Sequence, residues 1–516
     1  MARNIGRSLR KLDSVNPIHG LGHGRLGALD VAAQSIASVA PTAGLVTAPS
    51  LILAAGGAPG SSMLIATLVT MLVASSINQF TRRLAAPGSL YTFVVKGLHP
   101  AIGLITAAAL VIGYLFLSLA SLVGASSYLS QSFVPLMAST RHGASVVIEA
   151  ILAVVIAVLV VALLAVGVRR ATVTMLVIEV LSISTVMAAL VVAWFRGSRA
   201  HPQVGRSLGD AWGAGGGLTT WGTGVVLAMV AFIGFESSTA LGPETQRRMR
   251  LVPRVLSRTV LGVGAVFIVG ATLESALLLG LRLPPSATPV SDMMTTLGYR
   301  AAIPVLNLAA AASFVACATA SSMALVRLLL ALSVDGVLPA SLSLLHPRRQ
   351  TPQRAALAIM PVLCAAPAIM LALGVAPRPL MDRLIETSVT GYLVAYLLVC
   401  AAVLGFLPRI GEVTVRPMVA ALTAALALAA GLVTYCAFNF RAGVRLPTVT
   451  LAIGVLLALA WWCVMKFRAP NRIDRLGNYD HPSTTDVWWG PLPPITASAS
   501  ASAGQQVVDH ESGSRR

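Results

Sequence analysis

Long apolar runs separated by short polar stretches make up most of the chain between residues 29 and 467. A helix needs roughly 20 mostly apolar residues to cross a membrane. The pattern predicts twelve such helices, at residues 29–54, 62–81, 101–128, 144–167, 172–195, 219–244, 255–281, 302–332, 355–374, 384–407, 416–437 and 447–467. The predicted fold class is therefore an all-α membrane protein with one twelve-span domain over residues 29–467.

Two polar tails flank this domain. Residues 1–28 are basic and lack the short apolar core of a cleavable signal peptide, so they are predicted to be a cytosolic tail. Residues 468–516 are polar and rich in Ser, Ala and Pro, which predicts a disordered cytosolic tail.

Composition points to lipid as the solvent. Of the 516 residues, 56% are hydrophobic and 11% are charged, whereas a soluble chain carries about 25% charged residues. So much apolar surface cannot be hidden in soluble cores. The five cysteines all lie in apolar segments without a CxxC pair, which indicates small buried residues and neither a disulfide framework nor a metal site.

The net charge of +19 lies in short basic clusters between the apolar runs. This distribution is typical of membrane proteins, so nucleic-acid binding is not predicted. One set of loops and ends carries more than twice as many Lys and Arg residues as the other, which predicts a multi-pass protein of the cell membrane with both termini cytoplasmic. The basic stretch "PETQRRMRLVPR" is predicted to be an inner loop whose arginines meet anionic lipid and enforce the topology, with gating through Glu244 as the alternative.

Two spans carry signals of a helix break. In the first span, Pro41 removes a backbone donor and Gly44 follows, which predicts an interruption near residues 40–44. In the sixth span, Gly234 lies in mid-segment and Glu236 follows, although an intramembrane carboxylate is costly. Breaks five spans apart predict an inverted repeat of five plus five helices. The alternative for the first span is a proline kink packed by small residues.

Four motifs in order resemble the amino acid–polyamine–organocation superfamily of permeases. They are "APGSLYTFVVKGLHPAIG" after the second span, "FIGFESSTALGPETQ" with "RLVPR" in and after the sixth, "ATASSMALVRLLLALSVDGVLPASLSLLHPRRQTPQRAA" around the eighth, and "TSVTGYLVAYLLV" in the tenth. The resemblance covers about residues 26–467. It implies a LeuT-type fold with broken helices 1 and 6, two extra C-terminal helices, and secondary transport of amino acids or related amines.

The resemblance also implies a substrate site at the two breaks. Its residues would be Ser38, Ala40, Thr42, Ala43, Gly44, Phe232, Ile233, Gly234 and Phe235. Members often have Gly-Ser/Ala-Gly in the first helix, whereas this chain has Thr42-Ala43-Gly44, so Thr42 adds a side chain where close backbone approach is expected. Phe232 and Phe235 are predicted to pack in the apolar core, with an aromatic gate as the alternative.

Two carboxylates are candidates for coupling or gating. Several proton-coupled or sodium-independent members carry a lysine in their fifth helix, and the matching position here is Glu179. Glu179 is predicted to carry a proton, with a structural hydrogen bond between helices as the alternative. Glu236 is predicted to couple or gate, with a structural partner as the alternative.

Other polar residues of the spans are given structural roles. Glu149 is expected to be solvated near a membrane face, Glu274 to hydrogen-bond between helices, and Arg327 to pair with Asp335 or loop carbonyls. Three serines could line a sodium site, although serines more often bond to their own helix. They are Ser313, Ser321 and Ser322.

The predicted function is secondary active transport of an amino acid or amine, with proton-coupled import ahead of exchange or export. No cofactor is predicted beyond the proton gradient, and sodium is the less favoured ion. The expected partners are a small-molecule substrate and membrane lipid, and the sequence predicts no oligomeric state. An enzyme is disfavoured because the eight histidines do not cluster. A different twelve-span transporter class and a sensor built on a permease fold are the further alternatives.

Overall fold

The computed structural model describes residues 25–84, 86–133, 142–213, 218–284, 288–346, 351–441, 443–468, 470–473 and 476–477. Within these ranges the regular structure is helical, apart from an isolated bridge between Leu26 and Thr245. Most of the two predicted tails, residues 1–28 and 468–516, lies outside the described residues.

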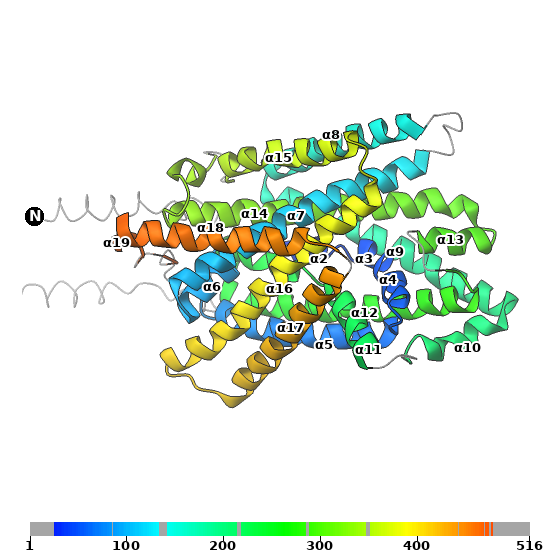
Figure 1. Cartoon of the computed structure of the whole chain (residues 1–516), viewed down its shortest axis with the longest axis horizontal. Helices are drawn as coiled ribbons and strands as arrows, with labels where there is room; N and C mark the ends of the chain where they lie inside the picture. Colours follow the sequence, from blue (N-terminus) through cyan, green and yellow to red (C-terminus); the bar gives the residue numbers. More distant parts are fainter. Residues whose placement is uncertain are drawn as a thin grey trace, which may run out of the picture.

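The main helices run along the long axis of the molecule (Figure 1). Their bounds are α2 (Ala28–Val39), α3 (Pro41–Leu45), α4 (Ala48–Ala54), α5 (Pro59–Thr81), α6 (Leu90–Gly97), α7 (Pro100–Phe133), α8 (His142–Val166), α9 (Val168–Ala200), α10 (Pro202–Asp210), α11 (Leu218–Val230), η3 (Phe235–Glu244), α12 (Arg248–Gly280), α13 (Pro289–Thr296), η4 (Arg300–Ala302), α14 (Ile303–Val334), η5 (Ala340–Ser343), α15 (Gln353–Ala372), α16 (Pro377–Arg409), α17 (Val415–Arg441), α18 (Leu446–Arg468) and α19 (Pro470–Ile473).

The structure holds eleven or twelve candidate membrane helices, against the twelve predicted. In the described part of the chain, eleven helices are long and apolar enough to cross a membrane, and the bent pair Ala28–Leu45 and Ala48–Ala54 makes a twelfth if it counts as one span. The prediction of an all-α membrane protein is therefore confirmed at this level. Several helices extend beyond the apolar runs: α9, for example, covers residues 168–200 where the pattern predicted 172–195.

The basic stretch after the sixth span differs from the prediction. It was expected to be an inner loop, but α12 begins at Arg248, so most of its arginines are helical. Arginine is a good helix former. A prediction from hydropathy alone finds apolar runs, so it misses the end of a helix that consists of charged residues. Pro253 lies within the second turn of α12.

The bundle has a buried centre and an exposed periphery. Helix α7 packs against both α14 and α16 at the centre, α5 packs along α12, and α8 lies beside α15 (Figure 1). The most apolar window of α18 is only 6% buried, compared with 67% for α7 and α16. Helix α18 therefore lies on the outside of the bundle, where lipid would surround it.

A buried ion pair ties α14 to the last residue of η3. The Nη2 of Arg327 lies 2.7 Å from Oε1 of Glu244, and the exposed fractions of the two side chains are 2% and 8%. The Glu244 carbonyl accepts the backbone N–H groups of Arg25 and Leu26. The prediction that Arg327 pairs with Asp335 is wrong: its partner is the carboxylate 83 positions earlier in the chain.

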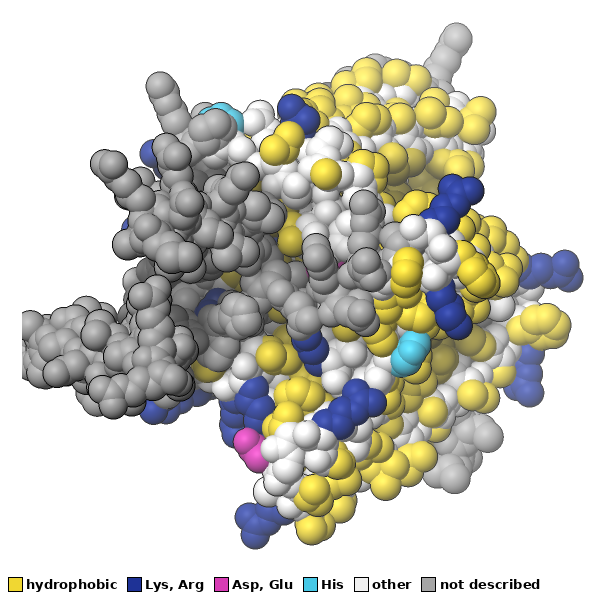
Figure 2. Space-filling model, turned by 90° about the vertical axis from the view of Figure 1, so that its left-hand side faces the viewer, with side chains coloured by type: hydrophobic (Ala, Val, Ile, Leu, Met, Phe, Trp, Pro, Cys, Tyr) yellow, Lys and Arg dark blue, Asp and Glu magenta, His cyan; other side chains and the backbone are white. Residues whose placement is uncertain are grey.

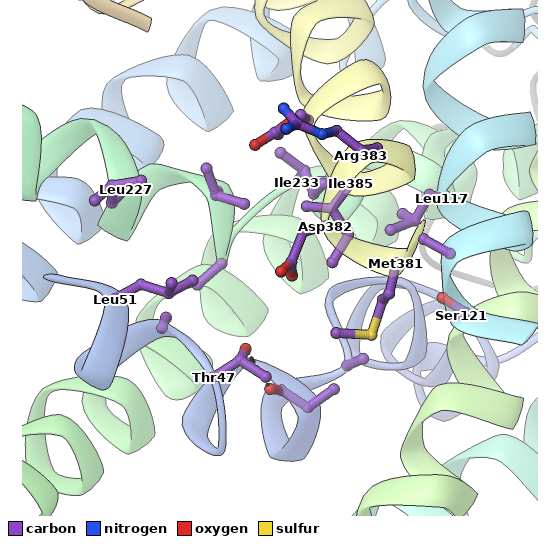
Figure 3. A pocket seen from close by; sticks show the side chains of 18 of the residues that line it. Thr47, Leu51, Leu117, Ser121, Leu227, Ile233, Met381, Asp382, Arg383 and Ile385 are labelled. Carbon is purple, nitrogen blue, oxygen red and sulfur yellow. Dashed lines mark hydrogen bonds and ion pairs between the residues drawn. The ribbon is translucent and has the colours of Figure 1, made fainter. Parts of the chain in front are cut away.

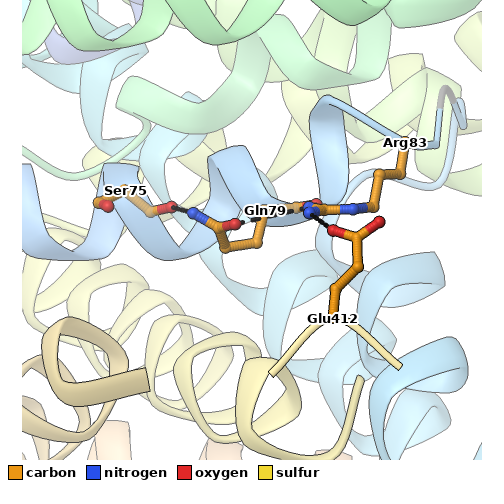
Figure 4. Close-up of polar contacts among 4 residues, drawn as sticks. All are labelled: Ser75, Gln79, Arg83 and Glu412. Atoms are coloured by element: carbon orange, nitrogen blue, oxygen red, sulfur yellow. Dashed lines mark hydrogen bonds and ion pairs between the residues drawn. The ribbon is translucent and has the colours of Figure 1, made fainter. Parts of the chain in front are cut away.

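A second ion pair lies at the surface, where α5 meets the turn between α16 and α17. Arg83 donates to the side chain of Glu412 and to the Gln79 carbonyl, and Gln79 donates to the Ser75 carbonyl (Figure 4). The exposed fractions of Arg83 and Glu412 are 27% and 56%. Such exposed pairs typically contribute about 0–1 kcal/mol.

The two ion pairs predict different responses to substitution. Arg327→Met leaves the Glu244 charge buried and unpaired, which should lower the free energy of unfolding by about 3–5 kcal/mol. The double variant Arg327→Met with Glu244→Leu should recover much of this loss, because no buried charge is left. Arg83→Met is the control and should cost less than about 1 kcal/mol. Thermal unfolding of the detergent-purified protein measures all four proteins, and equal losses for Arg327→Met and Arg83→Met would contradict the assignment.

Candidate functional site

The first predicted break lies between α2 and α3. Ala40 has a left-handed backbone conformation with φ +49°, which costs an L-residue roughly 1–2 kcal/mol. Pro41 follows as the first residue of α3. The larger bend, 53°, comes slightly later, between Leu45 and Ala48. The first span is thus interrupted twice, at the predicted position and again beyond Gly44.

The second predicted break lies between α11 and η3. Helix α11 ends at Val230, and the α-helix does not resume, because residues 235–244 form a 3-10 helix. Gly234 has φ +87°, and a Cβ added there would lie 2.4 Å from Oγ of Ser38. Both the conformation and the contact therefore require glycine, and the two breaks touch at this point.

Hydrogen bonds fasten the second break to α2. The Ser35 hydroxyl donates to the Phe235 carbonyl at 2.7 Å, and the Ser237 hydroxyl donates to the Gln34 carbonyl at 3.2 Å. The Gln34 amide in turn donates to the Ala320 carbonyl of α14 at 2.8 Å. Side chains thus satisfy backbone carbonyls at the break, as a buried non-helical segment requires.

A cavity of about 570 Å³ adjoins both breaks. Five of the predicted site residues line it: Ser38, Ala40, Ala43, Gly44 and Ile233. The cavity extends to residues near the end of α4, the start of α16 and the end of α17. Figure 3 shows part of this lining. The structure thus brings the first and sixth spans together around one cavity.

The other predicted site residues are buried beside the cavity and do not line it. Phe232 packs against Phe267, with ring centroids 5.1 Å apart, and Phe235 packs against Tyr396 at 5.4 Å. Thr42 is buried, and Gly234 faces Ser38. The two phenylalanines therefore pack in the core, and neither covers the cavity as a gate would.

Two serine hydroxyls on the cavity wall lack protein partners. Ser38 and Ser121 are each 1% exposed, and neither Oγ has a hydrogen-bond partner within the described part of the chain. An unsatisfied buried hydroxyl costs about 1–3 kcal/mol, so such groups normally meet water or a ligand. Ser38 lies on the broken first span and Ser121 on α7. The pair can hold a polar group at the wall of the cavity.

Several lining residues were missed by the sequence analysis. They come from α7, α14 and α16 and include Leu117, Ser121, Phe314, Cys317, Met381 and Ile385. Cys317 had been interpreted only as a small buried residue, but its thiol donates to the Ser38 carbonyl at 3.2 Å. One signal was available: Ser313, Cys317 and Ser321 recur every four residues on one face of a helix.

Four charged residues from the start of α16 also line the cavity. Arg378 lies 3.2 Å from Asp382, and Arg383 lies 3.3 Å from Glu386. Asp382 points into the cavity among Ile233, Ile385 and Met381 (Figure 3). Each carboxylate is paired with an arginine on the same helix, so the formal charge of the lining sums to zero.

Glu236 is the centre of a buried network under the second break. It accepts hydrogen bonds from the hydroxyls of Tyr114, at 2.9 Å, and Tyr396. The Tyr396 oxygen also accepts the backbone N–H of Gly234 at 2.9 Å. Glu236 itself does not line the cavity. One tyrosine thus links the carboxylate to the backbone of the break.

Glu179 bonds to a different helix. Both of its oxygens accept the hydroxyl of Ser313 on α14, at 2.9 and 3.1 Å. Ser322 donates to Ser118 on α7 at 3.1 Å, and Ser321 lies 4.0 Å from the Cys317 sulfur. Two of the three serines considered for sodium therefore bond to neighbouring helices and not back to their own.

The two remaining intramembrane glutamates differ from each other. Glu149 accepts a hydrogen bond from Ser130 at 2.9 Å and is half-buried, so it is less solvated than expected. Glu274 is fully buried, and neither of its oxygens has a partner among the described residues. The prediction of a hydrogen bond between helices is wrong for Glu274, since neither oxygen makes such a bond among the described residues.

The opposite end of the bundle is closed beneath the breaks. Ser89 hydrogen-bonds to Thr239, and Tyr91 donates to Asp335 at 2.8 Å. The backbone N–H of Gly477 also donates to Asp335, at 3.2 Å. Burial raises the pKa of the Asp335 carboxyl to about 7, against the lowering effects of the two hydrogen bonds and of Lys96. A segment from the end of the chain thus helps to seal this end.

Comparison with known families agrees with the geometry. The family model described as "Amino acid permease" matches residues 30–477. The chain belongs to the amino acid permease family. The permease therefore carries its two breaks, its cavity and its buried carboxylates within the matched region.

Three relatives show the range of proteins to which the permease is similar. It is 23% identical to the branched-chain amino acid permease BcaP of Bacillus subtilis, over 63% of this chain and 70% of that protein. It is 24% identical to the low-affinity putrescine importer PlaP of Escherichia coli, over 56% of this chain and 62% of the importer. It is 25% identical to the vacuolar cationic amino acid transporter 4 of Arabidopsis thaliana, over 69% of this chain and 59% of that protein. The match thus covers less than two thirds of the latter two relatives.

The Asp335 cluster predicts a pH-dependent stability. The folded pKa of about 7 lies above the value of about 3.9 for an unfolded Asp. The folded state therefore binds the proton more tightly, and its stabilisation is present at low pH and lost as pH rises through about 7. Asp335→Asn keeps an acceptor for Tyr91 and Gly477 but does not ionise.

The measurement is the difference in thermal midpoint between Asp335→Asn and the unaltered protein, followed from pH 5 to pH 8. The difference should grow in favour of the variant as pH rises towards about 7 and then level off. Asp210→Asn, at an exposed position of α10, is the matched control. A difference for Asp335→Asn that is independent of pH would contradict the assignment.

Proposed function

We propose that this permease is a secondary active transporter that imports zwitterionic amino acids with apolar side chains, together with protons. The observation that carries the proposal is the cavity where the two breaks meet, with two unpartnered hydroxyls on its wall. The breaks fall in the first and sixth of the twelve candidate spans, which supports a LeuT-type inverted repeat of five plus five helices with two added helices. Transport, with no chemical conversion, needs only a site that opens to each side in turn.

The polar end of the substrate would lie at the breaks. Ser38 and Ser121 offer hydroxyls that can donate to a carboxylate or accept from an ammonium group. The non-helical backbone at residues 231–234 and the left-handed Ala40 lie close by. At the breaks, these groups are the proposed partners of a charged α-amino acid end.

The side chain of the substrate would lie against apolar walls. Leu117, Ile233, Phe314, Met381 and Ile385 line the cavity. A putrescine dication would have to give up the hydration of two ammonium groups here without gaining an unpaired carboxylate, which is costly. The balanced charges of α16 therefore favour a substrate of zero net charge, such as leucine, over a polyamine or a cationic amino acid.

Glu179 is the proposed proton carrier. It bonds to Ser313, one helical turn from Cys317 on the cavity wall, so a rearrangement of α14 would reach it directly. An ionised carboxylate in such a buried place is costly without strong partners, and a single hydroxyl is a weak one. Glu236, with its two tyrosines, is proposed to gate the break.

The distribution of Lys and Arg residues supports the proposed membrane location and direction of transport. The excess of Lys and Arg at the ends that include the start of α12 and the end of α18 supports a cell-membrane protein with cytoplasmic termini. In that orientation the cavity faces outside and the Asp335 end is closed towards the cytoplasm, which supports import. Exchange and export stay as alternatives that the transport assay distinguishes.

Coupling is tested with proteoliposomes and an inside-alkaline pH gradient. The unaltered protein should accumulate labelled leucine when the gradient is imposed. Glu179→Gln should lose this response but keep leucine counterflow, because Gln still bonds to Ser313 but carries no proton. Glu274→Gln is the matched variant of another buried carboxylate and should keep both activities. Loss of gradient response in Glu274→Gln alone would move the proton to that residue, and uptake that needs only internal substrate would make the permease an exchanger.

Substrate class is tested by competition against labelled leucine. Isoleucine and phenylalanine should compete, whereas arginine, glutamate and putrescine should not. Arg378→Gln leaves Asp382 without its arginine, and competition by arginine should then improve by about tenfold, or about 1.4 kcal/mol. Arg206→Gln removes the same charge from the exposed face of α10 and should change nothing. If labelled arginine or putrescine enters and leucine does not, the substrate class is wrong; if no labelled amino acid or amine enters, transport itself is wrong.

A further inference from the structure

A third tyrosine lies beside the Glu236 network without a hydrogen bond to it. Tyr392 precedes Tyr396 by four residues on α16, so the two side chains share one face of that helix. The centroid of the Tyr392 ring lies 5.5 Å from that of Tyr114 and 5.8 Å from that of Tyr396. Tyr114 and Tyr396 are the two tyrosines that donate to Glu236. Tyr392 is therefore next to both donors of the same carboxylate.

The Tyr392 hydroxyl is buried without a partner. The residue is 0% exposed, and its oxygen makes no hydrogen bond to any part of the chain that the structure describes. Gly113 of α7 leaves room for the ring, because a Cβ added there would lie 3.1 Å from it. A phenylalanine would fill the same space without the cost of about 1–3 kcal/mol that an unsatisfied buried hydroxyl carries. The hydroxyl therefore points to a partner in another arrangement of the helices.

The Glu236 network joins two groups of elements that are each held together by their own hydrogen bonds. The second break is bonded to α2, where the Ser35 hydroxyl donates to the Phe235 carbonyl at 2.7 Å. Helix α16 is bonded to α7, where the Ser388 hydroxyl donates to the Gly113 carbonyl at 2.7 Å. Glu236 of η3 is held by hydroxyls of α7 and α16, so it lies at the contact between the two groups. Opening of the closed end requires η3 to move relative to α16, and the bond between Glu236 and α16 then has to change.

The spacing of the two tyrosines on α16 matches such a movement. Four residues correspond to about one turn, or about 6 Å, along a helix. Packed elements can move past one another by one turn, about 5.4 Å, between two stable positions. A shift of this size would take Glu236 from the Tyr396 hydroxyl to the Tyr392 hydroxyl. The buried carboxyl would then have a donor from α16 in both positions, which avoids the cost of an unsatisfied polar group.

We propose that Tyr392 is a positioning residue for transport, whose hydroxyl replaces that of Tyr396 as the α16 donor to Glu236 when the closed end opens. The inference rests on the proposed function, because it assumes that this end opens during transport. Tyr392 does not line the cavity, so it acts on the substrate only through Glu236 and the second break. Its hydroxyl lowers the stability of the closed arrangement and stabilises the open one.

The first test compares Tyr392→Phe with the unaltered full-length protein. In detergent, the thermal midpoint should stay the same or rise, because the variant removes only an unsatisfied hydroxyl. In proteoliposomes, the maximal rate of leucine uptake should fall by about tenfold, which corresponds to about 1.4 kcal/mol, while KM changes little. A lower thermal midpoint would show that the hydroxyl has a structural partner, and an unchanged maximal rate would show that transport does not use it. Either result overturns the inference.

The second test does not depend on the substrate. Thr239→Cys places a thiol at the closed end, where Thr239 is 2% exposed and bonded to Ser89. An anionic maleimide is a suitable reagent, because Lys and Arg side chains are spread over this end of the molecule (Figure 2). The rate at which the maleimide labels this thiol, followed by mass spectrometry, reports how often the end opens.

Adding Tyr392→Phe to Thr239→Cys should slow the labelling by about tenfold, because the open arrangement loses a hydrogen bond. Tyr299→Phe is the matched control, since it removes a tyrosine hydroxyl at the start of η4, outside the network, and should leave the rate unchanged. Equal or faster labelling in the Tyr392→Phe background overturns the inference even if leucine is transported. Slower labelling in a protein that transports no amino acid or amine supports the role of Tyr392 and overturns the proposed function instead.

Discussion

In hydrocarbon, a backbone N–H or C=O group without a partner costs several kcal/mol, and an unbroken helix avoids that cost. The permease interrupts two of its candidate spans, so the rest of the site depends on how the freed groups are satisfied. Tyr396 accepts the N–H of Gly234, and Ser35 donates to the Phe235 carbonyl. These partners come from α16 and α2, so the breaks are stable only inside the assembled bundle. The cavity is the space left open between the elements that these hydrogen bonds hold together.

Three buried glutamates of the bundle interior bond across helices, and a fourth, Glu274, differs from them. Glu236, Glu179 and Glu244 each accept hydrogen bonds from a neighbouring helix, and these contacts fix how α7, α14 and α16 pack around the breaks. Glu274 makes no such bond among the described residues. Burying this carboxyl without a hydrogen-bond partner costs free energy, which the packing of the surrounding helices must offset. A buried group of this kind is usually kept for a reason other than packing.

Sequence reasoning predicted the helices and the position of the breaks, because these depend on local properties. A run of apolar residues, a proline or a glycine affects the backbone structure at its own position in the sequence. The tertiary contacts of the side chains were less predictable. Arg327 was predicted to pair with Asp335, eight residues away, or with loop carbonyls, and instead pairs with Glu244, because the chain returns to that point through η3. The cavity walls from α7 and α16 were missed for the same reason: leucine, isoleucine and methionine look alike whether they face lipid, core or cavity.

Helix α17 lies outside the ten helices of the proposed repeat, yet its Tyr435, Phe438 and Asn439 line the cavity. They lie near the open end, and the closed end is built from α6, η3 and α14 instead. The two entrances of the proposed transport pathway are therefore made of different surfaces. A solute arriving from one side meets a tyrosine and an asparagine on a peripheral helix, and one arriving from the other side does not. The proposed pathway therefore has a built-in sidedness, and the apparent affinity for substrate need not be the same on its two faces.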